Sequence, residues 1–149
     1  MEFSRYELYD LINRPGPLYL VRADLSQARL YGATLNGANL LGANLHEADL
    51  STAKLYDAEL SEADLRNADL RSADLTNAGL VEAQLNGANL IGAKLHGAML
   101  HGADLSNTIL VQDYGTHILF AVLEGAQYDS KTKWPSGFNP KRAGAIFEG

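Results

Sequence analysis

The stretch that decides the fold runs from residue 63 to residue 80 and reads ADLRNADLRSADLTNAGL. It repeats the unit Ala-x-Leu-x-x, and the same unit continues on both sides. Leucine occupies every fifth position from Leu20 to Leu110, 19 times in succession, and alanine stands two residues before each leucine from Ala23 to Ala103. Internal repetition this strict predicts a fold built from one small unit that buries the same two side chains each time.

A spacing of five fits neither regular element. On an α-helix each residue turns about 100°, so successive leucines would step round by about 140° and spread over every side. On a flat strand an odd spacing sends alternate leucines to opposite faces. The backbone must therefore turn a corner within every repeat, which predicts a solenoid whose units bury their apolar side by stacking on their neighbours.

Repeats such as ADLSQ (23–27), ANLLG (38–42) and ADLRN (63–67) resemble the pentapeptide-repeat family over about 90 of the 149 residues. The resemblance implies an all-β fold, a right-handed quadrilateral parallel β-helix in which four repeats make one coil. In that family the leucine and the preceding small residue point inward. The tail, from Tyr128 through Trp134 to Ala145, is similar to the tails of many cyanobacterial members.

The chain is expected to form one domain in three segments: a capping helix over residues 1–17, the β-helix over 18–110, and a loop, a partial final coil and a C-terminal cap over 111–149. Ser4 and Glu7 match a helix capping box, with Phe3 placed to pack on Leu8. Leu8, Leu11 and Ile12 form an apolar stripe that we expect to lie over the first coil. From Leu110 to Leu123 is 13 residues, three more than two repeats, which predicts a bulging loop before the last coil.

Little in the sequence points to catalysis. The chain has no cysteine, which excludes disulfides, thiolate metal sites and a thiol nucleophile. His96 and His101 occupy equivalent positions of adjacent repeats without a carboxylate at metal-ligand spacing, so we interpret them as solvated. Ser130 and Lys133 match Ser-x-x-Lys, but the partner motifs of that acyl-enzyme signature are missing. We predict a protein that is not an enzyme and has no metal or cofactor.

The start of the chain does not resemble a secretory signal, and no run of 18 apolar residues occurs. These features predict a cytoplasmic protein that does not bind membranes.

Outward apolar residues favour a scaffold that presents a rigid surface to an unknown protein partner. With four repeats per coil they fall into two columns, which are Val21, Leu41 and Val81 in one and Tyr31, Ile91 and Val111 in the other. An alternative that stays open is that the helix and the tail cover the outer members. Self-association through an end cap would lengthen the rod.

The second hypothesis rests on charge, because the resemblance includes negatively charged rods that occupy the DNA site of type II topoisomerases. The formal net charge is -6. One predicted wall carries an acidic face of Asp24, Glu47, Asp64 and Asp104 against Arg66. A rod of about 22 Å, at about 4.8 Å per coil, would have to match about 13 charges of a DNA duplex. The charge count therefore favours the scaffold.

The tail carries Lys131, Lys133, Lys141 and Arg142 beside aromatic residues. Basic groups among aromatic rings can bind nucleic acid. The acidic balance of the whole chain argues against that use. We therefore expect no direct binding of nucleic acid.

Overall fold

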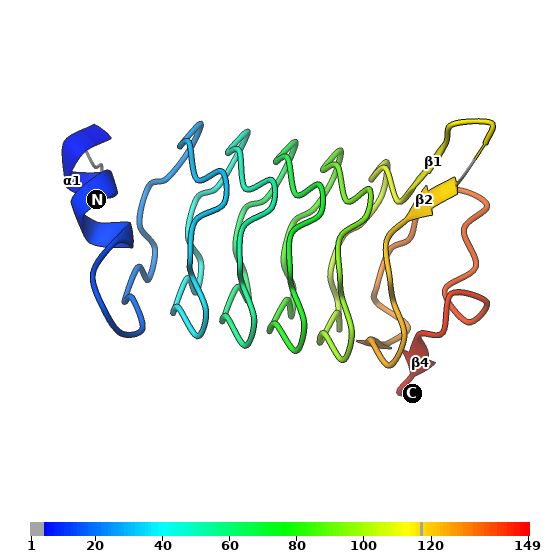
Figure 1. Ribbon diagram of the computed structural model, residues 1–149. Coiled ribbons are helices and arrows are strands. Elements are labelled where there is room, and N and C mark those ends of the chain that lie inside the picture. Colours follow the sequence, from blue (N-terminus) through cyan, green and yellow to red (C-terminus); the bar gives the residue numbers. More distant parts are fainter. Residues whose placement is uncertain (1–4, 117) are drawn as a thin grey trace.

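The computed structural model describes residues 5–116 and 118–149 as a rod of stacked coils (Figure 1). Parallel bridges join residues that are 20 apart along four separate ladders, which begin at Tyr19–Asn39, Asp24–Asn44, Arg29–Asp49 and Thr34–Lys54. Each coil therefore contains four repeats of five residues. The coil of four repeats, which the family resemblance implied, is confirmed.

Each corner of a coil is a tight turn. The N–H of Ala43 donates to the carbonyl of Leu40 across one such turn (2.9 Å), and the same bond recurs along the rod. The second residue after each leucine has a positive φ at all 18 corners from Arg22 to Asn107, and seven of these residues are glycine. At most of these corners the N–H of this residue also donates to a carbonyl of the next coil, as from Gly37 to Tyr56 (2.8 Å).

The interior is filled by the two repeated side chains. Every leucine at the repeated fifth position from Leu20 to Leu110 is at most 5% exposed, and every alanine from Ala33 to Ala103 is at most 7% exposed. The predicted inward positions are thus confirmed. Because alanine has a small side chain, opposite walls of the coil can approach closely around the leucine columns.

A short helix lies at the N-terminal end of the rod (Figure 1). Helix α1 spans Arg5–Ile12, and Leu8, Leu11 and Ile12 pack against the core. The predicted capping box depends on Ser4, and the contact with Leu8 depends on Phe3; both residues lie outside the described ones.

A β-hairpin interrupts the repeats after Leu110. Strands β1 (Val111–Asp113) and β2 (Ile118–Phe120) pair antiparallel. The coil then resumes, because Val122 bridges Lys94, which lies 28 residues earlier instead of 20. The hairpin is therefore an insertion of eight residues into a single repeat, at the place where the leucine spacing predicted a bulging loop before the last coil.

The last coil continues on two further walls, where Gln127 bridges Met99 and Lys133 bridges Asp104. Strand β3 (Gln127–Tyr128) pairs in parallel with β4 (Ile146–Phe147), which is the outermost strand on that wall. The aromatic residues of the tail form one cluster. Trp134 stacks on Phe138 (5.3 Å between ring centroids) and meets the ring of Tyr128 edge-on (5.4 Å).

Candidate interaction surfaces

The outer surface, and not the interior, carries the polar and reactive side chains of the rod. Within residues 5–116 and 118–149, no group of three or more His, Asp or Glu side chains is placed to hold a metal ion. His101 Nε2 lies 3.4 Å from a carboxylate oxygen of Glu148, and His46 Nε2 lies 3.4 Å from one of Glu47. His117 is outside the described residues. These polar side chains are therefore parts of outer surfaces that could bind a partner.

The first apolar column forms as the sequence predicted. Backbone bonds from Arg22 to Leu41 and from Glu62 to Val81 place these corners one above another. Val21 is 47% exposed, whereas Leu41 and Val81 are half-buried. A partner could contact this column at its N-terminal end most directly.

The second column is interrupted. Tyr31 is 69% exposed and Val111 is 48% exposed, but Ile91 is only 7% exposed. The hairpin covers this corner, since Leu119 Cδ2 lies 3.3 Å from the position that a Cβ on Gly92 would take. Ile91 is therefore inaccessible to a partner, and its proposed place on an interaction surface is wrong.

The acidic face forms, but most of its carboxylates have partners. Asp64 pairs with Arg66 (2.6 Å) and Asp104 pairs with Lys133 (3.0 Å). Glu47 accepts a hydrogen bond from Gln27 (2.9 Å). The described part of the chain offers no cation to Asp24, which accepts a hydrogen bond from the Ser26 hydroxyl (2.7 Å) instead.

Hydrogen bonds hold these aspartates ionised. The bond from Arg66 lowers the pKa of Asp64, and the bond from Ser26 lowers the pKa of Asp24. Burial acts to raise the pKa of Asp104, but hydrogen bonds from Ser106, Asn86 and Lys133 outweigh it, so that the pKa is well below its ordinary value. The same residues that keep the carboxylates charged also occupy their oxygens.

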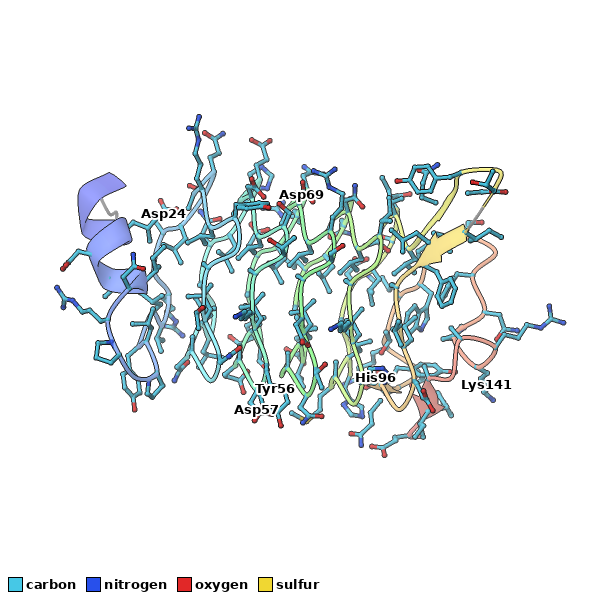
Figure 2. All side chains as sticks on the ribbon, viewed as in Figure 1. Asp24, Tyr56, Asp57, Asp69, His96 and Lys141 are labelled. Atoms are coloured by element: carbon cyan, nitrogen blue, oxygen red, sulfur yellow. The ribbon has the colours of Figure 1, made fainter. Side chains whose placement is uncertain are left out.

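Lys133 is the member of this wall that sequence reasoning missed. It joins the wall through the last coil, where it bridges Asp104. Four carboxylates against Arg66 and Lys133 leave a net charge of about -2, where the repeats alone gave about -3. Figure 2 shows Asp24 and Asp69 on one side of the rod and Tyr56, Asp57 and His96 on the other.

Two of the basic side chains in the tail contact other side chains of the protein. Lys133 bonds Asp104, so it is not directed at Ser130 as the acyl-enzyme signature would require. Lys141 lies over the ring of Phe147, with Nζ 5.6 Å from the centroid. Neither lysine is left as part of an open basic patch. Among the described residues, the guanidinium of Arg142 makes no ion pair and no hydrogen bond.

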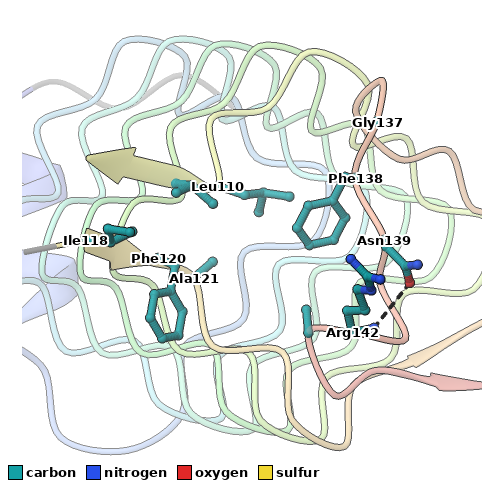
Figure 3. Close-up of a pocket in the computed structure, with 10 residues that line it drawn as sticks. Leu110, Ile118, Phe120, Ala121, Gly137, Phe138, Asn139 and Arg142 are labelled. Atoms are coloured by element: carbon teal, nitrogen blue, oxygen red, sulfur yellow. Dashed lines mark hydrogen bonds between the residues drawn. The ribbon is translucent and has the colours of Figure 1, made fainter.

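An apolar hollow of about 450 Å³ opens at the C-terminal end of the rod (Figure 3). Ile118 and Phe120 of the hairpin lie on one side, Phe138 and Arg142 lie on the other, and Leu110 contributes to the wall between them. Sequence reasoning missed this site because it described the segment after Leu110 only as a bulging loop. The available signal was the apolar run Ile118–Phe120, which follows Val111 after a turn that contains Gly115.

These features place the protein in the class of solenoid repeat proteins. The sequence matches the pentapeptide repeats family in eight copies, over residues 19–55, 53–90 and 80–112. The chain belongs to the pentapeptide repeat family, whose known structures are right-handed β-helices. Pentapeptide repeat proteins are generally structural or interaction proteins rather than enzymes.

The solved structures that are similar to this chain include two that bear on its fold. A pentapeptide repeat protein from the Arabidopsis thaliana thylakoid lumen is 38% identical, with a TM-score of 0.52 over 62% of this chain and 61% of that one. QnrB1, a plasmid-mediated fluoroquinolone resistance protein, is 14% identical, with a TM-score of 0.62 over 89% of this chain and 92% of that one. At that identity the second likeness shows the fold alone.

No curated protein matches the sequence. In the part of the chain that the structure describes, no helix is long and apolar enough to cross a membrane. The cytoplasmic location stays a prediction, because the Arabidopsis relative is from the thylakoid lumen.

Proposed function

We propose that this protein is a non-catalytic scaffold that presents a rigid β-solenoid surface to a protein partner. The observation that supports this most strongly is the filled interior, in which the repeated leucines and alanines leave only the outer surface for recognition. A catalyst needs groups that converge in a concavity. The polar side chains here instead diverge from the four walls.

The surface that we propose for the partner is the column of Val21, Leu41 and Val81, with Tyr31 on a separate wall. Tyr31 and Val21 are the most exposed of these four residues. Backbone ladders on both sides of each corner keep the column rigid, so binding would cost little backbone entropy. We also assign helix α1 and the tail beyond residue 128 the role of shielding the open ends of the sheet.

The charge hypothesis receives less support. Asp64 and Asp104 form ion pairs within the rod, so the face cannot offer all four charges to a DNA-binding enzyme. The glutamates of another wall, Glu59, Glu62 and Glu82, have no ion pair in the described ranges 5–116 and 118–149. They are too few to match the charge density of a duplex.

Affinity capture with surface variants tests the scaffold. The bait would be the whole protein, compared with Val21→Lys and Tyr31→Ser, and Tyr56→Ser on another wall would serve as the matched control. We expect a specific partner to be lost with Val21→Lys or Tyr31→Ser and kept with Tyr56→Ser, at unchanged Tm. A partner that survives all three changes would contradict the proposed surface, and measured turnover by the purified protein would contradict the scaffold itself.

A further inference from the structure

We propose that the C-terminal end of the rod binds an extended peptide segment, which adds as a strand to residues 108–110 and places a large aliphatic side chain in the hollow. A carboxylate in the segment would pair with Arg142. This inference rests on the proposed function, since it names the chemistry of a partner at one defined place.

The first support is an open sheet edge in register with the ladder. One coil earlier, the N–H of Leu90 donates to the carbonyl of Ile109 (2.8 Å), and the N–H of Ile109 donates to the carbonyl of Ala88 (3.0 Å). At the last rung of this wall, the equivalent groups are the N–H of Leu110 and the carbonyl of Thr108. Neither has a hydrogen-bond partner among the described residues. They offer one donor and one acceptor at the spacing that a parallel strand requires.

The second support is the position of the hollow. Leu110 lines it, together with Ala121 and Phe138. In the regular coils the bridges place each leucine above the leucine 20 residues earlier, so the inward residue of an added strand would lie against Leu110. The hollow has room for an aliphatic side chain, and burying one there would strengthen binding because apolar surface is removed from water.

The third support is charge. Arg142 lines the hollow, and its backbone N–H is held by Asn139 Oδ1 (3.1 Å). Its guanidinium has no partner within residues 5–116 and 118–149, and a guanidinium pairs best with a carboxylate. A second copy docked through its own C-terminal end would bring a second Arg142 and Lys141 to this end of the rod. Charge complementarity therefore favours an acidic peptide over a second copy.

The chain's own repeat supplies the probe, because Ala-x-Leu is the sequence that each rung accepts. A fluorescein-labelled peptide, Gly-Gly-Ala-Asn-Leu-Asp with a free carboxylate, would be titrated with the full-length protein by fluorescence polarisation. One control peptide carries an N-methyl group on the asparagine, which removes the donor to Thr108. A second replaces the leucine by serine, and a third ends in lysine.

We expect saturable binding that is at least tenfold weaker for the N-methyl and serine peptides, consistent with loss of one hydrogen bond or one buried side chain. In the protein, Arg142→Glu should reverse the preference between the acidic and lysine-ended peptides. Ile118→Asp, on the hairpin side of the hollow, should weaken binding. Ile146→Asp is the matched control, because Ile146 is 50% exposed and does not line the hollow.

Equal binding of the N-methyl peptide, or no binding of any peptide, would overturn strand addition. Sedimentation would reveal a dimer, and a dimer that excludes the peptide would show a second copy to be the occupant. Capture of a partner that depends on Val21 or Tyr31, without peptide binding, would refute this inference and leave the proposed function intact.

Discussion

Lys133 Nζ lies 3.0 Å from Asp104 Oδ2, although the two residues are 29 positions apart in a rod whose regular repeat is 20. The extra nine positions comprise the hairpin insertion and one further residue between Gln127 and Lys133. The regular spacing is thus broken twice, and Lys133 still takes the next place in the ladder of carboxylates and amides that ends with Asp104.

The Asp104 contact predicts a pH dependence of stability. Folding lowers the pKa of Asp104 from its ordinary value of 3.8, so the unfolded chain takes up this proton at a higher pH than the folded chain. The stabilisation is complete above that value and is lost as the pH falls below it. We expect the free energy of unfolding of Asp104→Asn to fall less steeply below about pH 4. Denaturant titrations across acid pH would measure it.

Lys133→Met is the companion variant, because it removes only one of the groups that hold Asp104 ionised. Its slope should lie between those of the wild type and Asp104→Asn. A wild-type slope in both variants would contradict the assignment.

The corner glycines predict a graded cost of adding a methyl group. Gly37 and Gly87 both have a positive φ, but a Cβ on Gly37 would meet nothing within 4 Å, whereas one on Gly87 would lie 2.3 Å from Asn67 Oδ1. Gly37→Ala should cost about 1 kcal/mol from the backbone alone. Gly87→Ala should cost more, since Asn67 must also move. Equal losses in chemical denaturation would show that Asn67 yields freely.

The core predicts strong effects at single positions. Leu65 and Ala68 are at most 1% exposed. Leu65→Ala should lower the free energy of unfolding by about 2–5 kcal/mol through the cavity that it leaves. Ala68→Leu should cost about 1–3 kcal/mol or more through overpacking. Calorimetry of both variants, with the exposed change Tyr56→Ser as control, would check this, and wild-type melting of either would contradict the inward assignment.

Removal of residues 113–120 should restore the repeat. The deletion joins Gln112 to Ala121 and leaves Leu110-Val-Gln-Ala-Val-Leu, which is the regular Ala-x-Leu spacing. We expect the variant to fold, because Val122 already bridges Lys94 without help from the hairpin. It should lose peptide binding, since Ile118 and Phe120 are removed. If circular dichroism showed this variant to be unfolded, the stability of the rod would depend on the hairpin, which covers Ile91.

The acidic face, in which Asp64 and Asp104 are ion-paired, predicts no charge mimicry of DNA. A gyrase supercoiling assay with excess protein should show no inhibition. Inhibition relieved by added linear DNA, and by neutralising Asp24, Glu47, Asp64 and Asp104 together, would contradict this expectation. Inhibition that weakens steeply as the salt concentration is raised would also contradict it.

The repeats could be predicted from sequence because a spacing of five admits few backbone paths that bury every leucine. The inward places of Leu65 and Ala68 followed from that constraint alone. The hairpin could not be predicted in the same way, since Val111 and Ile118–Phe120 keep no repeat and their pairing depends on where Val122 rejoins the ladder. For this reason the burial of Ile91, the partner of Asp104 and the hollow beside Arg142 all required the structure.

The hydrogen bonds at the corners also bear on how the protein ages chemically. Asn36-Gly37 and Asn86-Gly87 are dipeptides of the kind most prone to deamidation, in which the glycine nitrogen attacks the asparagine side chain. Here the N–H of Gly37 is held by the carbonyl of Tyr56 (2.8 Å), and Asn36 Oδ1 accepts from the N–H of Tyr56 (3.2 Å). The Asn86 side chain is likewise held by the Ser106 hydroxyl (2.7 Å). Because the ladder restrains the reacting groups, the rod tolerates at its corners a sequence that would decay in a flexible loop.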